Sequence, residues 1–186
     1  EKYGFEPNGP VVVELFPNQQ DFAVRTFGMP AVEGFLGVCF GKVITANSPG
    51  TQTAHPVNWE AVLWHEFTHV ISLQLTCNKM PRWLSEGISV FEERQANPTW
   101  GQSMTARYRE RVLNEGLTKV SELSAAFLTP KTEEDLQFAY YQSGLVVEFL
   151  VGKYGLDALK AILADLREGI EINTSIPKHT AALSEV

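Results

Sequence analysis

The chain has 186 residues, of which 44% are apolar and 20% are charged, as in an ordinary globular protein. This length suits one domain or two small lobes. The formal net charge of −7 argues against nucleic acid as a partner, because phosphate binding needs a positive surface. No apolar run approaches the roughly 18 residues of a membrane span, so we expect none in this chain.

The first 50 residues predict a small sheet. Residues 10–17 form an apolar run bracketed by prolines, which favours a strand. A capping Asn and a terminating Gly then flank a short helix expected at residues 19–27. Residues 35–46 favour one or two further strands, with Gly37 and Gly41 as bends or points of close approach.

The next helix carries the motif His-Glu-x-x-His. Residues 58–75 contain no Gly or Pro and show apolar helical spacing. His65 and His69 are four residues apart, so they lie on one helix face and can bind one cation, with Glu66 beside a water on that cation. Zinc fits such a ligand set. The alternative is a buried helix whose histidines satisfy each other, which we disfavour because burying these groups without a metal is costly.

Geometry suggests a third ligand. Residues 77–81 form a turn that ends in proline, and a second helix is expected at residues 82–95. The rise from His69 to the helix end is about 10 Å, and Glu86 lies about 6 Å into the second helix. An antiparallel return therefore brings Glu86 level with the histidines, and Gly87 would let the two helices approach closely.

Two motifs together resemble a known family. His-Glu-x-x-His at residues 65–69 and Trp-Leu-Ser-Glu-Gly at residues 83–87 resemble the gluzincin metallopeptidases, especially the bacterial peptidase MA-like domains. Ala-Tyr-Tyr-Gln-Ser at residues 139–143 resembles the third conserved helix of that family, and the likeness spans roughly residues 11–169.

The resemblance implies an α+β fold with a thermolysin-like (zincin) core. A small N-terminal sheet packs on the zinc-binding helix, and a mainly helical lobe follows. We expect one domain over residues 1–186, with lobes of about 1–77 and 78–186 around a cleft that holds the metal. Because the chain begins at Glu1 rather than Met, we expect a processed protein or part of a larger one with flanking domains.

The second half predicts four more helices, at residues 99–114, 120–127, 133–154 and 156–168. Thr132 and Asp135 are spaced for a capping box on the third of these. After Gly169 the pattern weakens, and no element is predicted. We interpret three arginines as a solvated helix face paired with glutamates, namely Arg107, Arg109 and Arg111 with Glu110 and Glu115.

The function that the resemblance implies is zinc-dependent hydrolysis of peptide bonds in a peptide or protein substrate. His65, His69 and Glu86 would hold Zn²⁺, and Glu66 would act as general base. An aminopeptidase of this family carries Gly-x-Met-Glu-Asn before the zinc helix. This chain lacks that motif, so we favour endopeptidase action.

The family also implies roles for residues around the metal, and here the alternatives stay open. Tyr140 matches the position of an oxyanion-stabilising tyrosine, with Tyr141 as the fallback, but Tyr140 also fits a core stripe of its helix. Residues 34–40 are either the edge strand that binds substrate backbone or an ordinary core strand. Glu92 and Glu93 lie at a solvated helix end in our interpretation, with hydrogen bonding to a metal ligand as the alternative.

A rival function is a binding or scaffold module that keeps this fold without catalysis. The intact Glu66 argues against it, because a structural zinc site needs no base. A third possible function is that of a zinc hydrolase acting on a non-peptide amide or ester.

Cys39 and Cys77 are interpreted as two buried free thiols rather than a bridge. The compartment stays open, with a periplasmic or secreted location favoured.

Overall fold

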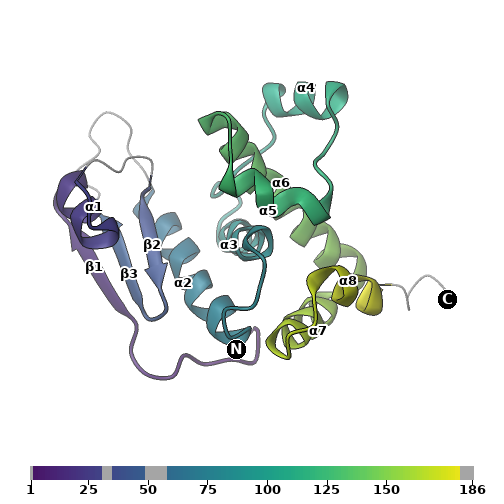
Figure 1. The fold of residues 1–186 in the computed structure, drawn as a ribbon, viewed down its shortest axis with the longest axis horizontal. Helices are drawn as coiled ribbons and strands as arrows, with labels where there is room; N and C mark the ends of the chain where they lie inside the picture. Colours follow the sequence, from purple (N-terminus) through teal and green to yellow (C-terminus); the bar gives the residue numbers. More distant parts are fainter. Residues whose placement is uncertain (1, 31–34, 49–57, 181–186) are drawn as a thin grey trace. The chain divides into compact units, whose positions relative to one another are not determined.

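The computed structural model describes residues 2–30, 35–48 and 58–180, which form a three-stranded sheet and eight α-helices. The fold is therefore α+β and mostly helical. The chain divides into two compact units, Glu1–Gln74 and Leu75–Val186, and Figure 1 shows the elements of each. Among the described residues, none of the helices combines the length and hydropathy that a membrane crossing needs.

The first unit is built on a sheet with strand order β1-β3-β2. Central β3 runs parallel to β1 and antiparallel to β2, which confirms the predicted strands and resolves residues 35–46 into two of them. Their bounds are Val12–Phe16 for β1, Gly37–Phe40 for β2 and Val43–Asn47 for β3. Gly41, with a φ of 63°, makes the tight turn between β2 and β3.

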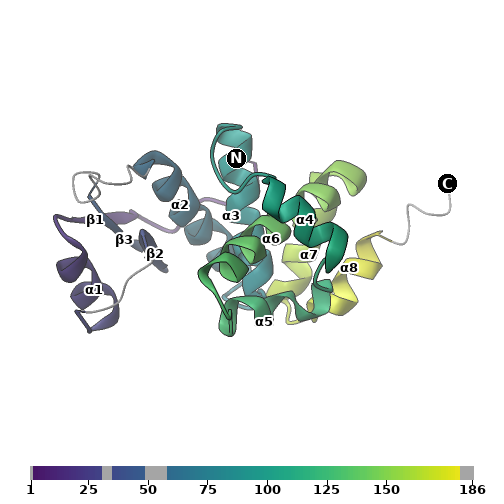
Figure 2. The same cartoon turned by 90° about the horizontal axis from the view of Figure 1, so that it is seen from above.

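Two helices cover opposite faces of this sheet, α1 (Gln19–Phe27) and α2 (Trp59–Leu75) (Figure 2). Alternate residues of a strand face opposite sides. Thr45 of β3 lies against α1, where its hydroxyl is 3.0 Å from that of Thr26. Gly37 of β2 faces α2 instead, next to Glu66. The expected packing of the motif-bearing helix on the N-terminal sheet is thus confirmed.

The second unit is centred on α3 (Arg82–Ala96) and α6 (Glu133–Tyr154), which pack closely together. Small residues on both helices make this approach possible. A Cβ atom on Gly87 would lie 2.5 Å from the carbonyl oxygen of Ser143, and one on Gly144 would lie 2.7 Å from a methyl of Val90. The atoms that a Cβ atom on Gly87 would meet therefore belong to α6.

The remaining helices of this unit are α4 (Ala106–Asn114), the 3₁₀ turn η2 (Val120–Glu122), α5 (Leu123–Leu128), α7 (Leu156–Arg167) and α8 (Ile172–Thr180). Two of them differ from the prediction. α4 begins seven residues later than expected, because the hydroxyl of Thr105 caps it by accepting a hydrogen bond from the backbone N–H of Tyr108. α8 was not predicted, since the sequence pattern weakens after Gly169, and the helix contains Pro177.

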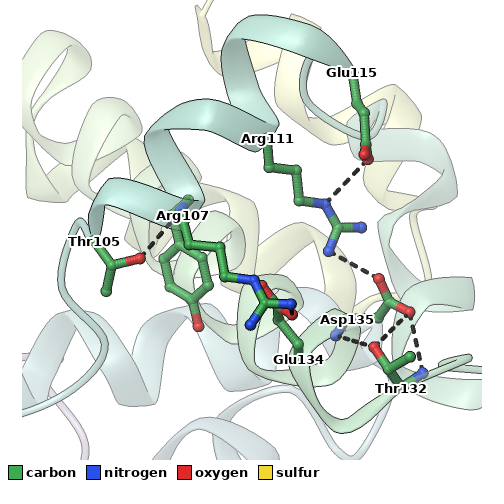
Figure 3. A network of polar contacts seen from close by, with 8 residues as sticks. Thr105, Arg107, Arg111, Glu115, Thr132, Glu134 and Asp135 are labelled. Atoms are coloured by element: carbon green, nitrogen blue, oxygen red, sulfur yellow. Dashed lines mark hydrogen bonds and ion pairs between the residues drawn. The ribbon is translucent and has the colours of Figure 1, made fainter.

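Figure 3 shows how α4 is tied to the start of α6. The predicted capping box is present: Thr132 and Asp135 satisfy each other's backbone N–H groups. Arg111 pairs with Glu115, as predicted, at 3.4 Å, and also with Asp135 at 2.8 Å. Arg107 pairs with Glu134. Two arginines of the predicted solvated face thus reach a second helix, and the cluster is structural.

A buried carboxylate ties α8 to α7. Asp165 of α7 accepts hydrogen bonds from the hydroxyl of Ser175 at 2.9 Å and from the ammonium group of Lys178 at 2.8 Å. Its Oδ2 also lies 2.8 Å from Nε2 of His179. The Lys178 hydrogen bond is the largest cause that lowers the pKa of Asp165 from 3.8 to about 2. A helix containing a proline is therefore held by polar contacts.

We expect Asp165→Asn to loosen α8, because the uncharged amide loses the charge-assisted bonds to Lys178 and His179. Limited proteolysis within α8 should become at least several-fold faster. Asp157→Asn, a change at a fully exposed aspartate of α7, is the control and should have no effect.

The lowered pKa means that the Asp165 carboxylate stabilises the fold above about pH 4, and that this stability is lost as the pH falls towards 2. Protection of α8 that is unchanged from pH 7 to pH 2 would contradict this assignment.

Candidate metal centre

Helix α2 buries several polar residues and exposes several aromatic ones. The side-chain oxygen of Asn58 accepts hydrogen bonds from two backbone N–H groups of its first turn. Glu66 and His69 are buried, with 7% and 9% of their surface exposed, whereas Trp64 and Phe67 are 45% and 41% exposed. A helix normally buries its aromatic residues and exposes its ionisable ones. This reversal indicates that the polar face serves a site.

Three side chains bring possible ligand atoms together. The rings of His65 and His69 have centroids 4.8 Å apart and are inclined by 77°. One ligand atom from each histidine and one carboxylate oxygen of Glu86, from α3, all lie within 4.8 Å of one another. These three residues could therefore hold one metal ion.

The donor set fits zinc. Two imidazoles and one carboxylate are the protein ligands of a common class of catalytic zinc site, in which the fourth position is left for water or substrate. His65 is half-buried, and the other two residues are buried. Burying a carboxylate beside two imidazoles is costly unless a cation or hydrogen bonds compensate the charge. Bound zinc would supply this compensation.

Arg82 supports the third ligand and was missed in the sequence. Its Nε lies 3.4 Å from Oε1 of Glu86, one helical turn away on α3. Its guanidinium also lies over the ring of Phe127, 5.7 Å from the centroid. The signal that could have revealed it is the four-residue spacing between Arg82 and Glu86, which places both side chains on one helix face.

Glu66 lies against the sheet. A Cβ atom on Gly37 of β2 would be 2.9 Å from Cγ of Glu66 and 3.2 Å from its Oε1. The negative charge of Glu66 also acts on Cys39, two residues further along the same strand face. Burial first, and the Glu66 charge second, raise the pKa of the Cys39 thiol to about 12. Cys39 is therefore a neutral thiol near pH 7, and it is not among the three grouped ligand residues.

A family model, described as Peptidase MA superfamily, matches residues 1–180. The chain belongs to the peptidase MA superfamily. This confirms the resemblance inferred from the two motifs, and it makes a peptidase-like function the expected one. No curated protein and no solved structure matches the chain.

The two tyrosines considered for a peptidase MA oxyanion site lie in different surroundings on α6. Tyr141 is buried in an aromatic cluster with Tyr108 and Phe138, and its hydroxyl donates to Sδ of Met104 at 3.6 Å. Tyr140 is half-buried, with its ring edge-on to Phe127 at 5.1 Å between centroids. Phe127 is also the ring beneath Arg82, the partner of Glu86. Tyr141 thus serves the core, and Tyr140 remains the candidate.

Other sequence predictions near this site have mixed outcomes. Glu92 and Glu93 are 8% and 7% exposed, so the interpretation of a solvated helix end is wrong. Gly34 lies outside the described residues, but Gly37–Phe40 form β2, an edge strand of the sheet. Both cysteines are free, as interpreted, but neither is fully buried: Cys39 is half-buried and Cys77 is exposed. It lies with Asn78 in the turn after α2, where both residues have positive φ.

Proposed function

We propose that this protein is a zinc metallopeptidase that hydrolyses peptide bonds by a gluzincin-type mechanism on a thermolysin-like core. The observation that carries this proposal is the grouping of His65, His69 and Glu86, whose ligand atoms lie within 4.8 Å of one another in a peptidase MA chain. We further propose that residues 1–186 act as one catalytic domain, with flanking domains in a larger protein.

The residues of the site have separate roles in this mechanism. His65, His69 and Glu86 would hold a zinc ion, which when bound would polarise the scissile carbonyl and lower the pKa of a water. Glu66 takes the proton of the attacking water and then delivers it to the leaving amine, so one carboxylate serves as base and then as acid. The hydroxyl of Tyr140 donates a hydrogen bond to the oxygen that becomes negative.

Metal content and activity of the purified protein test this function. We expect about one zinc per chain and hydrolysis of a mixed peptide library that a chelator abolishes and added zinc restores. Internal cleavage of peptides with blocked termini would support endopeptidase action, which we favour. Cleavage of simple amides or esters alone would favour a non-peptide hydrolase.

A scaffold without catalysis is the second candidate, as a vestigial module of a larger protein. The burial of Glu66 argues against a scaffold, because burying a carboxylate is costly and a binding module does not need one beside the metal ligands. Retention of zinc without cleavage of any peptide in a broad library would favour the scaffold function over the enzyme.

For the location of the protein we propose the periplasm or the cell exterior, which fractionation of the native host would test.

Tyr140→Phe should reduce kcat of peptide hydrolysis by about ten- to a thousandfold, because it removes one hydrogen bond to the developing oxyanion. KM and zinc content should change little, since the ring and its contact with Phe127 remain. Tyr154→Phe is the matched control on the same helix, where the ring packs on Phe149. An unchanged kcat in Tyr140→Phe would assign Tyr140 to the core stripe alone.

A further inference from the structure

Among the described glycines of the first unit, Gly37 is the one required by space rather than by backbone conformation. It lies in the extended strand β2, and its φ is outside the left-handed region. By contrast, Gly28 and Gly41 have positive φ, and nothing lies within 4 Å of a Cβ atom placed on either. At Gly37 such an atom would meet Glu66 and Val62 of α2, both at 2.9 Å.

These contacts are too short for any side chain at position 37. Cβ atoms in proteins do not approach other atoms to 2.9 Å, so a residue other than glycine would displace its neighbours. Val62 is itself only half-buried, so its isopropyl group has more room to move. Glu66 is 7% exposed, so its side chain has little room to retreat. The strand therefore leaves a bare stretch of backbone against which the Glu66 side chain rests.

The next residue on the same strand face shows that the crowding is local. Cys39 faces the same side of the sheet as Gly37, because the two are two residues apart in β2. This position carries a side chain, whose thiol lies near enough to feel the Glu66 charge. The strand thus accommodates a side chain at position 39 and leaves none at position 37, where the Glu66 side chain lies.

We propose that Gly37 is a positioning residue for the general base, because it holds open the space that sets the position of the Glu66 carboxylate. This inference rests on the proposed function for its catalytic consequence. In this role Gly37 acts through its contact with Glu66. Displacement of a catalytic group by about 1 Å can cost about a hundredfold in rate, so a small shift would be visible.

The test is Gly37→Ala in the full chain. We expect kcat to fall about ten- to a hundredfold with KM within about twofold and zinc content unchanged, because binding groups stay in place and only the base moves. Gly152→Ala is the control for the substitution itself, since nothing lies within 4 Å of a Cβ atom there. A Gly37→Ala protein with wild-type kcat would overturn the proposal.

Two double variants separate positioning from packing. In Gly37→Ala/Val62→Ala the contact with Val62 is relieved and the one with Glu66 remains, so we expect the loss of kcat to persist. Recovery of kcat would show that the clash with Val62, rather than the one with Glu66, caused the loss, and it would overturn the proposal. In a Glu66→Gln background, Gly37→Ala should cost nothing further, because the base is already absent. A full additional loss there would also overturn it.

A crystal structure of Gly37→Ala provides a measurement that does not depend on activity. We expect the Glu66 carboxylate to be displaced from its wild-type position while the backbones of α2 and β2 stay in place. An unmoved Glu66 would refute the positioning role. If the wild-type protein cleaves no peptide, the proposed function fails, and this structure still decides whether Gly37 sets the position of Glu66. Should Gly37→Ala fail to fold, Gly37→Ala/Val62→Ala is crystallised instead, because it removes half of the crowding.

Discussion

Glu66→Gln is expected to reduce kcat/KM for peptide hydrolysis by at least about a hundredfold, the usual scale for a positioned acid–base group. Glutamine keeps the size of the side chain but cannot accept the proton of the attacking water. Glu66 is not one of the three grouped ligand residues, so zinc content should stay at about one per chain. Steady-state kinetics and metal analysis on the same preparation make the measurement.

Glu60→Gln is the matched control, because Glu60 lies in the first turn of the same helix and is exposed. It should retain wild-type activity. If Glu66→Gln kept most of its activity while Glu60→Gln did too, the base would have to be another group. If Glu66→Gln instead lost its zinc, Glu66 would be acting on the metal site itself rather than on the water.

Alanine at His65, His69 or Glu86 is expected to remove bound zinc, from about one ion per chain to below about one tenth after dialysis. Two remaining protein ligands hold the ion too weakly to compete with water and buffer. All chelator-sensitive activity should disappear with the metal. The content would be measured by mass spectrometry of the metal in purified protein.

His179→Ala controls for the loss of an imidazole elsewhere, since His179 contacts Asp165 far along the chain from the motif. It should retain its zinc. Stoichiometric zinc in Glu86→Ala would refute the assignment of the third ligand. Glu92 and Glu93, which lie buried further along α3, would then be the next candidates.

The parts of this chain that were predicted well depend on local interactions. Helix α6 begins and ends where the sequence places it, because the capping box at Thr132 and the terminating Gly155 act within one turn of the chain. α2 follows from an apolar period unbroken by Gly or Pro, and that period also fixes His65 and His69 on one face. The sequence by itself therefore determined the metal motif and the element that carries it.

Contacts between distant residues had no such local signal. The nearest neighbours of Gly87 lie on α6, and Glu92 and Glu93 are buried together with most of α3. α8 was missed because its sequence pattern is weak and includes Pro177, whereas Asp165, which bonds to its residues, belongs to another helix. Helix propensity carries no information on such stabilising contacts, because they depend on which helices and strands pack together.

The surroundings of Glu66 show the same division. The sequence determined that Glu66 lies between two histidines on a helix, and it marked Gly37 as a point of close approach without saying what approaches. Only the tertiary structure decided that Glu66 is the neighbour, because it alone sets which residues of β2 face α2. The physical reason is that strand register and helix packing depend on residues far apart in the sequence. Helix caps and hydrophobic periodicity depend on residues only a few positions apart.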